Sequence, residues 1–150
     1  MFAPKAILVP TDFSRFSDQA LAKAVDIAKQ FHSRIYLFHV LDQGLQQCIA
    51  DYCLSGETMR QIEEEGMRAS KERLESEAKR ILGDNGVEIT FDIGKGIPYD
   101  EILKEQKAKG IDLIVIASHG RTGILKNLIG GVAEKVARGA ECPVLLVRGQ

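Results

Sequence analysis

The chain lacks a long hydrophobic run, a secretory leader and a surplus of charge of either sign. Its longest apolar stretches fall far short of the roughly 20 residues that cross a bilayer, and Met1 to Lys5 does not contain the apolar core of a signal peptide. Twenty lysines and arginines against 21 aspartates and glutamates give a net charge of -1, which provides no basic surface for nucleic acid or an anionic membrane. We therefore expect a soluble, cytoplasmic protein that binds neither nucleic acid nor membranes.

Cysteine is scarce as well. The three cysteines, Cys48, Cys53 and Cys142, form neither a C-x-x-C motif nor a zinc-spaced cluster, and three thiols cannot all pair. This usage fits a reducing compartment. Cys48 and Cys53 are either a redox pair or ordinary packing thiols, and the second interpretation is favoured because free cysteine is commonly buried.

The usual motifs of nucleotide enzymes and hydrolases are absent. There is no G-x-x-x-x-G-K-[ST], and the first apolar run leads into Pro10-Thr11-Asp12-Phe13-Ser14 without the G-x-G-x-x-G of dinucleotide-binding domains. There is also no G-x-S-x-G nucleophile elbow. These absences exclude a P-loop NTPase, a Rossmann dehydrogenase and an α/β-hydrolase by their standard signatures.

What is present is a repeated alternation between short apolar runs and helical periodicity, which is typical of βαβ units around a parallel sheet. The third apolar run alternates strictly, so we expect one face in solvent or a place at the sheet edge. A length of 150 residues suits one domain over 1–150. The prediction is an α/β fold: a doubly wound five-stranded parallel sheet in the order 3-2-1-4-5, with helices on both faces. The five expected strands are Ala6–Val9, Ile35–Val40, Val87–Ile93, Ile111–Ile116 and Pro143–Val147.

Four helices are expected between these strands. The first is capped by Ser17 and runs to Phe31, and the third begins at Pro98 and ends at Gly110. The second is highly charged and is ended by Gly83 and Gly86; its apolar face comprises Met59, Ile62, Met67, Ser70, Leu74, Ala78 and Ile81. The last helix has an apolar face of Leu128, Ile129, Val132, Ala133, Val136 and Ala137.

Two polar loops are predicted to meet where the winding of the sheet reverses. Pro10-Thr11-Asp12 follows the first strand, and the segment from Ala117 to Gly131 follows the fourth. Glycines there allow backbone amides to approach an anion, and a helix that starts near Gly131 directs its N–H groups to the same point. The pattern therefore predicts a nucleotide site, with Asp12 accepting hydrogen bonds from a sugar or base and the glycine loop holding phosphates. Arg121 and Lys126 could add positive charge.

Each of these residues also has a structural interpretation. Asp12 could form a turn or a cap, and the G-x-x-G of Gly120 to Gly123 could be turn residues. His119 could orient the loop, contact phosphate or act as an acid, but no base or nucleophile is identified beside it, so we expect no catalytic residue. His32 and His39 lie far from it in sequence, and we expect no metal site. The segment from Gln43 to Glu57 is a lid, a docking surface or a plain loop.

Three motifs in this order resemble the universal stress protein family. They are Ile7-Leu8-Val9-Pro10-Thr11-Asp12-Phe13-Ser14, the stretch from Asp112 to Gly123, and Cys142-Pro143-Val144-Leu145-Leu146-Val147. The resemblance implies a cytoplasmic dimer with this sheet, and one branch of the family binds ATP through G-x-x-G, nine residues and G-[ST]. By that pattern Gly120 and Gly130 line the phosphates, and Val132 extends the phosphate loop. Asp12 and the backbone near Val40 hold the nucleoside.

The chain departs from that pattern at two positions. Ala117 replaces the first glycine, and Gly131 replaces the serine or threonine whose hydroxyl would bond a phosphate oxygen. A lost hydroxyl hydrogen bond costs about 0.5–1.5 kcal/mol, so the backbone contact remains usable, whereas a methyl group at residue 117 would clash if the ligand approaches closely. We expect a non-enzymatic regulatory protein that binds ATP, AMP or ADP, with Mg²⁺ as the companion of a triphosphate. The alternative is a nucleotide-independent interaction protein with a degenerate cleft.

The final strand suggests a partner. Pro143 to Val147 is expected at an edge of the sheet, where an exposed apolar strand invites pairing with another strand. A second copy of the chain related by a two-fold axis can provide that strand. We therefore expect a homodimer through Pro143–Val147, and client proteins that the sequence does not identify.

Overall fold

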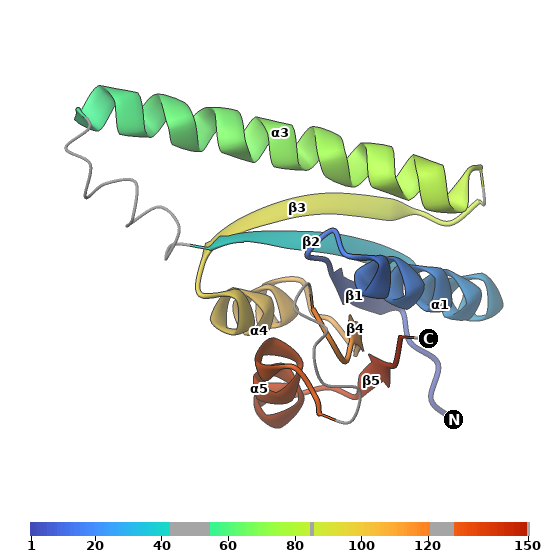
Figure 1. Ribbon diagram of the computed structural model, residues 1–150. Helices are drawn as coiled ribbons and strands as arrows, with labels where there is room; N and C mark the ends of the chain where they lie inside the picture. The colour runs from blue at the N-terminus through green and yellow to red at the C-terminus, as the bar shows by residue number, and fades with distance from the viewer. Residues whose placement is uncertain (43–54, 85, 121–127, 150) are drawn as a thin grey trace.

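The computed structural model describes residues 1–42, 55–84, 86–120 and 128–149. Strands and helices alternate along the described chain, as Figure 1 shows. The strands are β1 (Ala6–Pro10), β2 (Arg34–Asp42), β3 (Ile89–Gly96), β4 (Leu113–Ala117) and β5 (Val144–Val147). The helices are α1 (Arg15–Phe31), α3 (Gly56–Leu82), α4 (Pro98–Ala108) and α5 (Gly131–Gly139).

The sheet confirms the predicted topology. Its strand order is β3-β2-β1-β4-β5, and all neighbouring strands are parallel. β1 pairs with β2 on one side and with β4 on the other, with Ile7 opposite Leu113 and Leu8 opposite Ile114. The chain therefore reverses its winding between β1 and β4, and a crevice opens between the carboxyl ends of these two strands.

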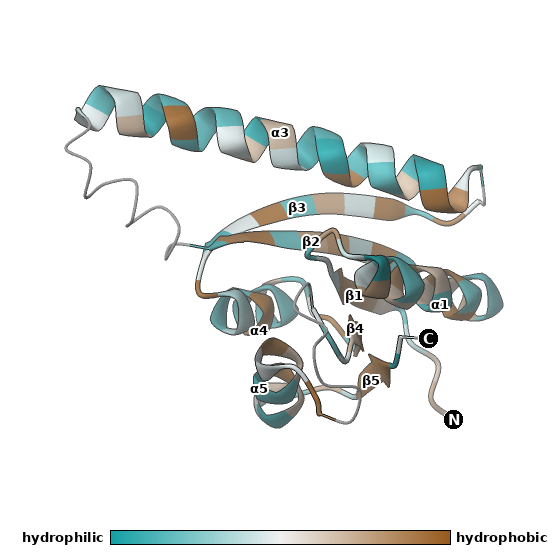
Figure 2. Ribbon diagram, viewed as in Figure 1, coloured by the Kyte–Doolittle hydropathy of each residue, from teal (hydrophilic) through white to brown (hydrophobic). Residues whose placement is uncertain are grey.

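Helices cover both faces of the sheet. Apolar side chains of the strands alternate between the faces, and each set packs on its own pair of helices. Figure 2 shows hydrophobic residues along the strands and hydrophilic ones over much of the helices. The cluster on the side of α1 and α3 contains Ile7, Val9, Leu21, Val25, Ile35, Leu37, Leu74 and Val115, among others. The cluster on the side of α4 and α5 contains Leu8, Phe38, Ile102, Ile111, Ile114, Ile116, Ala133 and Val136.

The start of α1 corrects one prediction. The N-cap is Ser14, not Ser17: Ser14 has extended backbone angles, and its side-chain oxygen accepts a hydrogen bond from the Ser17 amide at 3.3 Å. Ser17 lies inside the first turn and is buried. A cap receives its hydrogen bond from the third residue into the helix, so two serines three apart are easily exchanged when only the sequence is read.

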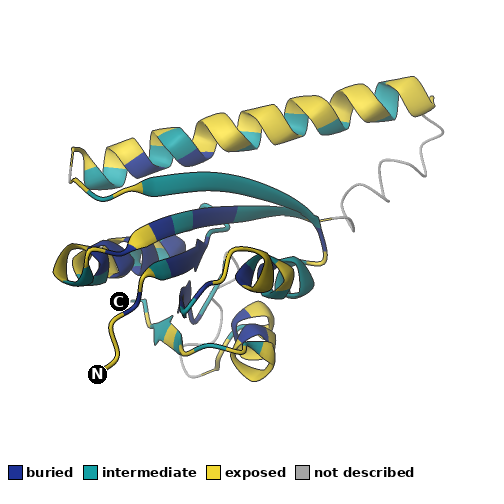
Figure 3. Ribbon diagram, turned by 180° about the vertical axis from the view of Figure 1, so that it is seen from behind, coloured by how far each residue is buried: buried dark blue, intermediate teal, exposed yellow. Residues whose placement is uncertain are grey.

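Helix α3 is less buried than its apolar periodicity predicted. Only Leu74 and Ala78 are buried, whereas Ile62 and Met67 are 38% and 41% exposed. Figure 3 shows exposed residues along most of this helix, and Figure 1 shows its N-terminal end extending past the end of β3. No strand lies beneath that end of the helix. None of the described helices combines the length and the apolar character needed to span a bilayer.

The remaining boundaries need smaller corrections. β3 begins two residues later than predicted, at Ile89, and continues to Gly96 at the edge of the sheet. Helix α5 begins at Gly131, so Leu128 and Ile129 precede it and are 60% and 45% exposed. The expected apolar face of this helix reduces to Ala133 and Val136. Pro98 is the first residue of α4, as predicted.

Candidate functional site

A cavity of about 270 Å³ lies at the carboxyl ends of β1 and β4. Its volume is close to the lower end of the range for ligand pockets, about 300–1,000 Å³. The predicted site residues that line it are Pro10, Thr11, Asp12, Val40, Ala117, His119, Gly120, Gly130, Gly131 and Val132. The predictions for Arg121, Gly123, Lys126, Cys48, Cys53 and most of the 43–57 segment lie outside the described residues.

Thr11 organises the loop between β1 and α1. Its amide donates to the carbonyl of Phe38 at 2.8 Å, and its hydroxyl oxygen accepts from the amide of Phe13 at 3.0 Å. The hydroxyl of Ser17 donates to the carbonyl of Ser14 at 2.8 Å, so the proton shared between Thr11 and Ser17, 2.9 Å apart, comes from Thr11. The Thr11 side chain is thus committed to holding the loop.

The two carboxylate oxygens of Asp12 lie in different surroundings. Oxygen Oδ1 accepts a hydrogen bond from the Ser14 amide at 3.0 Å, which is the turn expected of an aspartate at this position. Oxygen Oδ2 faces across the cavity, since a Cβ on Gly120 would lie only 2.9 Å from it. The two loops therefore meet as predicted, and Gly120 leaves room for the Asp12 carboxylate.

Ser118 anchors the other side of the cavity, a role that sequence reasoning did not assign to it. It is buried, its amide donates to the carbonyl of Val147 at 2.9 Å, and its carbonyl accepts from the amide of Gly130 at 2.6 Å. The Gly130 amide is therefore not available to a ligand. A Cβ on Gly130 would lie 3.2 Å from the Ser118 carbonyl oxygen, so a glycine is needed to bring the two backbones together.

The first turn of α5 presents backbone amides to the cavity. Gly130 is the N-cap and provides no side-chain acceptor, and the first amide bonded within the helix is that of Glu134, at 2.9 Å from the Gly130 carbonyl. The amides of Gly131, Val132 and Ala133 have no acceptor among the described residues, and all three residues line the cavity. The positive end of the helix dipole lies at the same point. This arrangement favours an anion.

Ala117 does not close the cavity. The side chain belongs to the cluster on the α1 side of the sheet together with Val9 and Val115, so its methyl group packs into that core. The residue is 8% exposed and still contributes to the cavity wall. At Gly131, by contrast, a Cβ would meet no atom of the described residues within 4 Å.

Two histidines line the cavity. His39 Nδ1 lies 2.8 Å from the carbonyl oxygen of Thr11, which can only accept, so Nδ1 carries a proton. His119 Nδ1 pairs with the hydroxyl of Ser118 at 2.9 Å, and its ring lies 6.3 Å from that of Phe16. Over the ranges the structure describes, no three His, Cys, Asp or Glu side chains are grouped as metal ligands.

Sequence reasoning missed the apolar wall of the cavity. It is formed by inward-facing residues of β2, β4 and the start of α4, which read in the sequence as ordinary core positions. They are Phe38, Pro98, Ile102 and Ile116; His39, Ser17, Ser118 and Ala133 complete the missed lining residues. Because successive side chains of a strand point to opposite faces, the sequence could have shown which face of the sheet Phe38 and Ile116 occupy. It could not have shown that they contact a cavity.

Comparisons with known proteins agree with this geometry. The model of the universal stress protein family matches residues 4–148. Universal stress proteins MJ0531 and MJ0577 of Methanocaldococcus jannaschii are 33% and 32% identical to the chain, which is covered to 96% in both cases; the alignments cover 82% and 94% of those proteins.

Solved structures show the same fold. The structure of MJ0577 superposes with a TM-score of 0.83 at 28% identity, covering 99% of both chains. A universal stress protein in complex with cAMP gives a TM-score of 0.67 at 22% identity over 98% of both chains. The Archaeoglobus fulgidus universal stress protein in complex with dAMP gives 0.62 at 21% identity, covering 97% of this chain and 99% of that one. With its topology, its motifs and its whole length in agreement, the chain belongs to the universal stress protein family.

Proposed function

We propose that this protein is a regulatory protein that binds ATP, or another adenine nucleotide, in the cavity between β1 and β4 and does not turn it over rapidly. The observation that carries this proposal is the row of three amides at the start of α5, at Gly131, Val132 and Ala133, which have no acceptor among the described residues. The first amides of a helix have no partner within the helix, and phosphate oxygens are suitable acceptors for them.

The opposite wall suits a nucleoside. Asp12 presents a carboxylate oxygen toward Gly120, and this group can accept hydrogen bonds from ribose hydroxyls. Behind it, Phe38, Val40 and Ile116 provide an apolar surface for a flat base. Two solved members of the family are complexes with cAMP and dAMP, which supports an adenine nucleotide as the ligand.

Slow turnover is part of the proposal because the known contacts of the polar side chains in the cavity are structural. Asp12 Oδ1 is bonded to the Ser14 amide and His119 Nδ1 to Ser118, so these two atoms hold the loops in place. We expect Mg²⁺ to enter with a triphosphate, because Mg²⁺ is usually held by one or two carboxylates, phosphates and water. The backbone amides then need only contact the phosphates.

The test is calorimetric titration with ATP, AMP and inorganic triphosphate, with and without Mg²⁺. The proposal requires saturable 1:1 binding of ATP and AMP. No heat, together with no thermal shift at millimolar nucleotide, would instead favour the nucleotide-independent interaction protein with a degenerate cleft. Product analysis after incubation with ATP separates binding from hydrolysis.

We further propose that the protein forms a homodimer through β5. This strand pairs with β4 on one side and is the last strand of the sheet, and its residues Val144–Val147 are all apolar. Leu145 is 38% exposed. An edge strand of this composition is a site for pairing with a second copy.

Light scattering at micromolar concentration tests this arrangement. The wild type is expected to have twice the mass of one chain, and Leu145→Lys to shift it to a monomer because a charge would lie in the apolar contact. A wild-type monomer would overturn the dimer. The exposed Val132→Lys change, on α5, is the matched control and leaves the mass unchanged.

A further inference from the structure

Phe13 has a backbone conformation that a bulky side chain rarely adopts. Its φ angle is 62°, and among the described non-glycine residues only His32 shares a positive φ. Residues of this kind persist where the surrounding structure determines their conformation, and they are often found at functional sites. Phe13 directly follows Asp12, so the contacts that hold the Phe13 ring also bear on the loop that carries Asp12.

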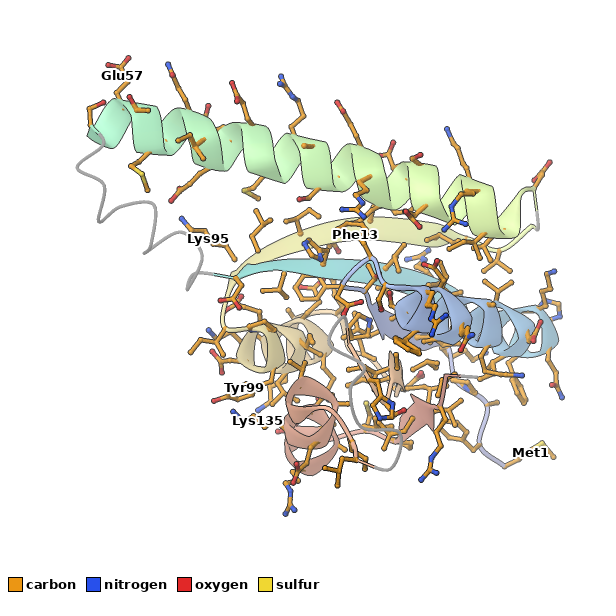
Figure 4. The ribbon with its side chains drawn as sticks, in the orientation of Figure 1. Met1, Phe13, Glu57, Lys95, Tyr99 and Lys135 are labelled. Atoms are coloured by element: carbon orange, nitrogen blue, oxygen red, sulfur yellow. The ribbon has the colours of Figure 1, made fainter. Side chains whose placement is uncertain are left out.

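Two side chains contact the Phe13 ring. The imidazole of His39, on β2, lies with its ring centroid 4.4 Å away and tilted by 46°. The guanidinium carbon of Arg73, on α3, lies 4.1 Å from the ring centroid, a cation–π distance. Figure 4 shows Phe13 beneath α3, near the beginning of α1. We refer to Arg73, Phe13 and His39 as the Phe13 stack.

The Phe13 stack holds both residues that flank Asp12 in the chain, Thr11 and Phe13. His39 Nδ1 donates to the carbonyl of Thr11, and the Phe13 amide donates to the Thr11 hydroxyl. Asp12 lies between these two residues, so the direction of its carboxylate depends on the conformation that the stack maintains. Asp12 Oδ2 lies 2.9 Å from the place that a Cβ on Gly120 would take. A rotation of the loop would therefore change which carboxylate atoms face the cavity.

Helix α3 has few other attachments near the site. Leu74 and Ala78 are buried, and Arg80 bonds Asp18 of α1 at 3.0 Å. Arg73 directly precedes the buried Leu74. The packing of Leu74 on the sheet therefore fixes α3 where the Arg73 side chain can contact Phe13. The stack therefore joins a largely exposed helix to the loop that carries Asp12.

We infer that Arg73 and Phe13 are positioning residues for the nucleoside half of the site, and that they couple α3 to its occupancy. This inference rests on the proposed nucleotide site. Arg73 holds the Phe13 ring, the ring and His39 hold the loop, and the loop directs the Asp12 carboxylate. Because coupling is reciprocal, a bound nucleotide in turn stabilises the seating of α3.

The test compares four variants with the wild type. Arg73→Met keeps length and apolar contact but removes the charge, and Arg73→Lys restores a cation. Phe13→Gly removes the ring while suiting the positive φ. Arg68→Met is the matched control, since Arg68 is an exposed arginine of the same helix. Thermal unfolding of each variant verifies that it is folded.

The expected result is a selective loss of nucleoside binding. Arg73→Met weakens ATP and AMP binding about two- to five-fold and Phe13→Gly about ten-fold. Arg73→Lys recovers most of the loss, Arg68→Met has no effect, and inorganic triphosphate binds to all variants as to the wild type. Unchanged AMP affinity in Arg73→Met and Phe13→Gly would overturn the inference, as would an equal loss for triphosphate.

A second measurement remains informative if the wild type binds no nucleotide and the proposed function fails. Hydrogen exchange of the Phe13 and Ser14 amides, which bond Thr11 and Asp12, reports the loop without any ligand. Faster exchange in Arg73→Met, but not in Arg68→Met, supports loop positioning by the stack. Equal exchange in both variants would reject it.

Discussion

The two sides of the cavity differ in how their polar groups are used. On the β1–α1 side, the Thr11 hydroxyl and one oxygen of Asp12 are hydrogen-bonded within their own loop. On the α5 side, the amides of Gly131, Val132 and Ala133 have no acceptor in the part of the chain that is described. The first side is preorganised and can be selective, whereas the second has backbone donors left over for an anion. Substitutions on the two sides should therefore have different signatures.

The largest effect is expected at Asp12. Asp12→Ala removes the carboxylate from the nucleoside side and is expected to weaken AMP binding about ten- to a hundred-fold, the range for a lost charge-assisted hydrogen bond. Inorganic triphosphate, which would contact only the α5 side, keeps its affinity. Calorimetry with both ligands measures the difference. Equal losses for the two would show that the sides do not act separately.

A smaller loss is expected when the space between the two sides is filled. Gly120→Ala places a Cβ 2.9 Å from Asp12 Oδ2, so the carboxylate must move, and ATP affinity is expected to fall about ten-fold. Gly131→Ala adds the same methyl group where no atom lies within 4 Å and changes the affinity less than about two-fold. If both variants bound ATP equally, the contact between Gly120 and Asp12 would have no role in binding.

On the α5 side, a substitution is expected to raise ATP affinity. Gly131→Ser introduces a hydroxyl beside the free amides, and the open space at this residue accommodates it. One additional hydrogen bond to a phosphate oxygen is expected to raise ATP affinity about three- to ten-fold. Gly131→Ala is again the control, because it lacks the hydroxyl. No gain over that control would place the phosphates elsewhere.

The smallest effect is expected at a pair of carboxyl groups that do not line the cavity, Asp92 of β3 and Glu105 of α4. Burial, and then the hydrogen bond with Asp92, raise the pKa of Glu105 from 4.5 to about 7, and Lys109, 3.5 Å from Asp92, opposes the shift. Because the folded protein holds this proton more tightly than the unfolded chain, stability falls as the pH rises from about 4.5 to about 7.

Glu105→Gln isolates this pair. It is expected to remove that fall and to be more stable than the wild type above pH 7, by at most about 1 kcal/mol because Glu105 is partly exposed to water. Urea unfolding at pH 5 and pH 8 measures the difference. Nucleotide affinity should not change, so a change would show that both sides of the cavity respond to distant packing.

The sheet and the meeting of the two loops were predictable because they depend on local patterns. Apolar runs mark buried strands, and right-handed crossovers leave few topologies for them. The placement of Asp12 beside Gly120 follows from that topology alone. In the same way, Pro98 at the start of α4 was identified from the fixed φ of proline.

Apart from the N-cap of α1, what the sequence did not reveal concerns contacts between residues distant in sequence. The commitment of the Gly130 amide to Ser118 and the exposure of Leu128 and Ile129 depend on where the loop before α5 returns to β4. The contact of Arg73 with Phe13 joins residues sixty positions apart, and an arginine on a charged helix carries no local signal. The hydrophobic periodicity of strands and helices indicates which face of an element is buried, but not which distant residue contacts it.

The open space at Gly131 has a consequence for how such proteins diverge. A side chain gained or lost at this position moves no atom of the described residues, so one substitution can change the contacts with a ligand while the packing of those residues stays the same. Descendants of a common ancestor can thus differ widely in ligand affinity while their scaffolds remain superimposable.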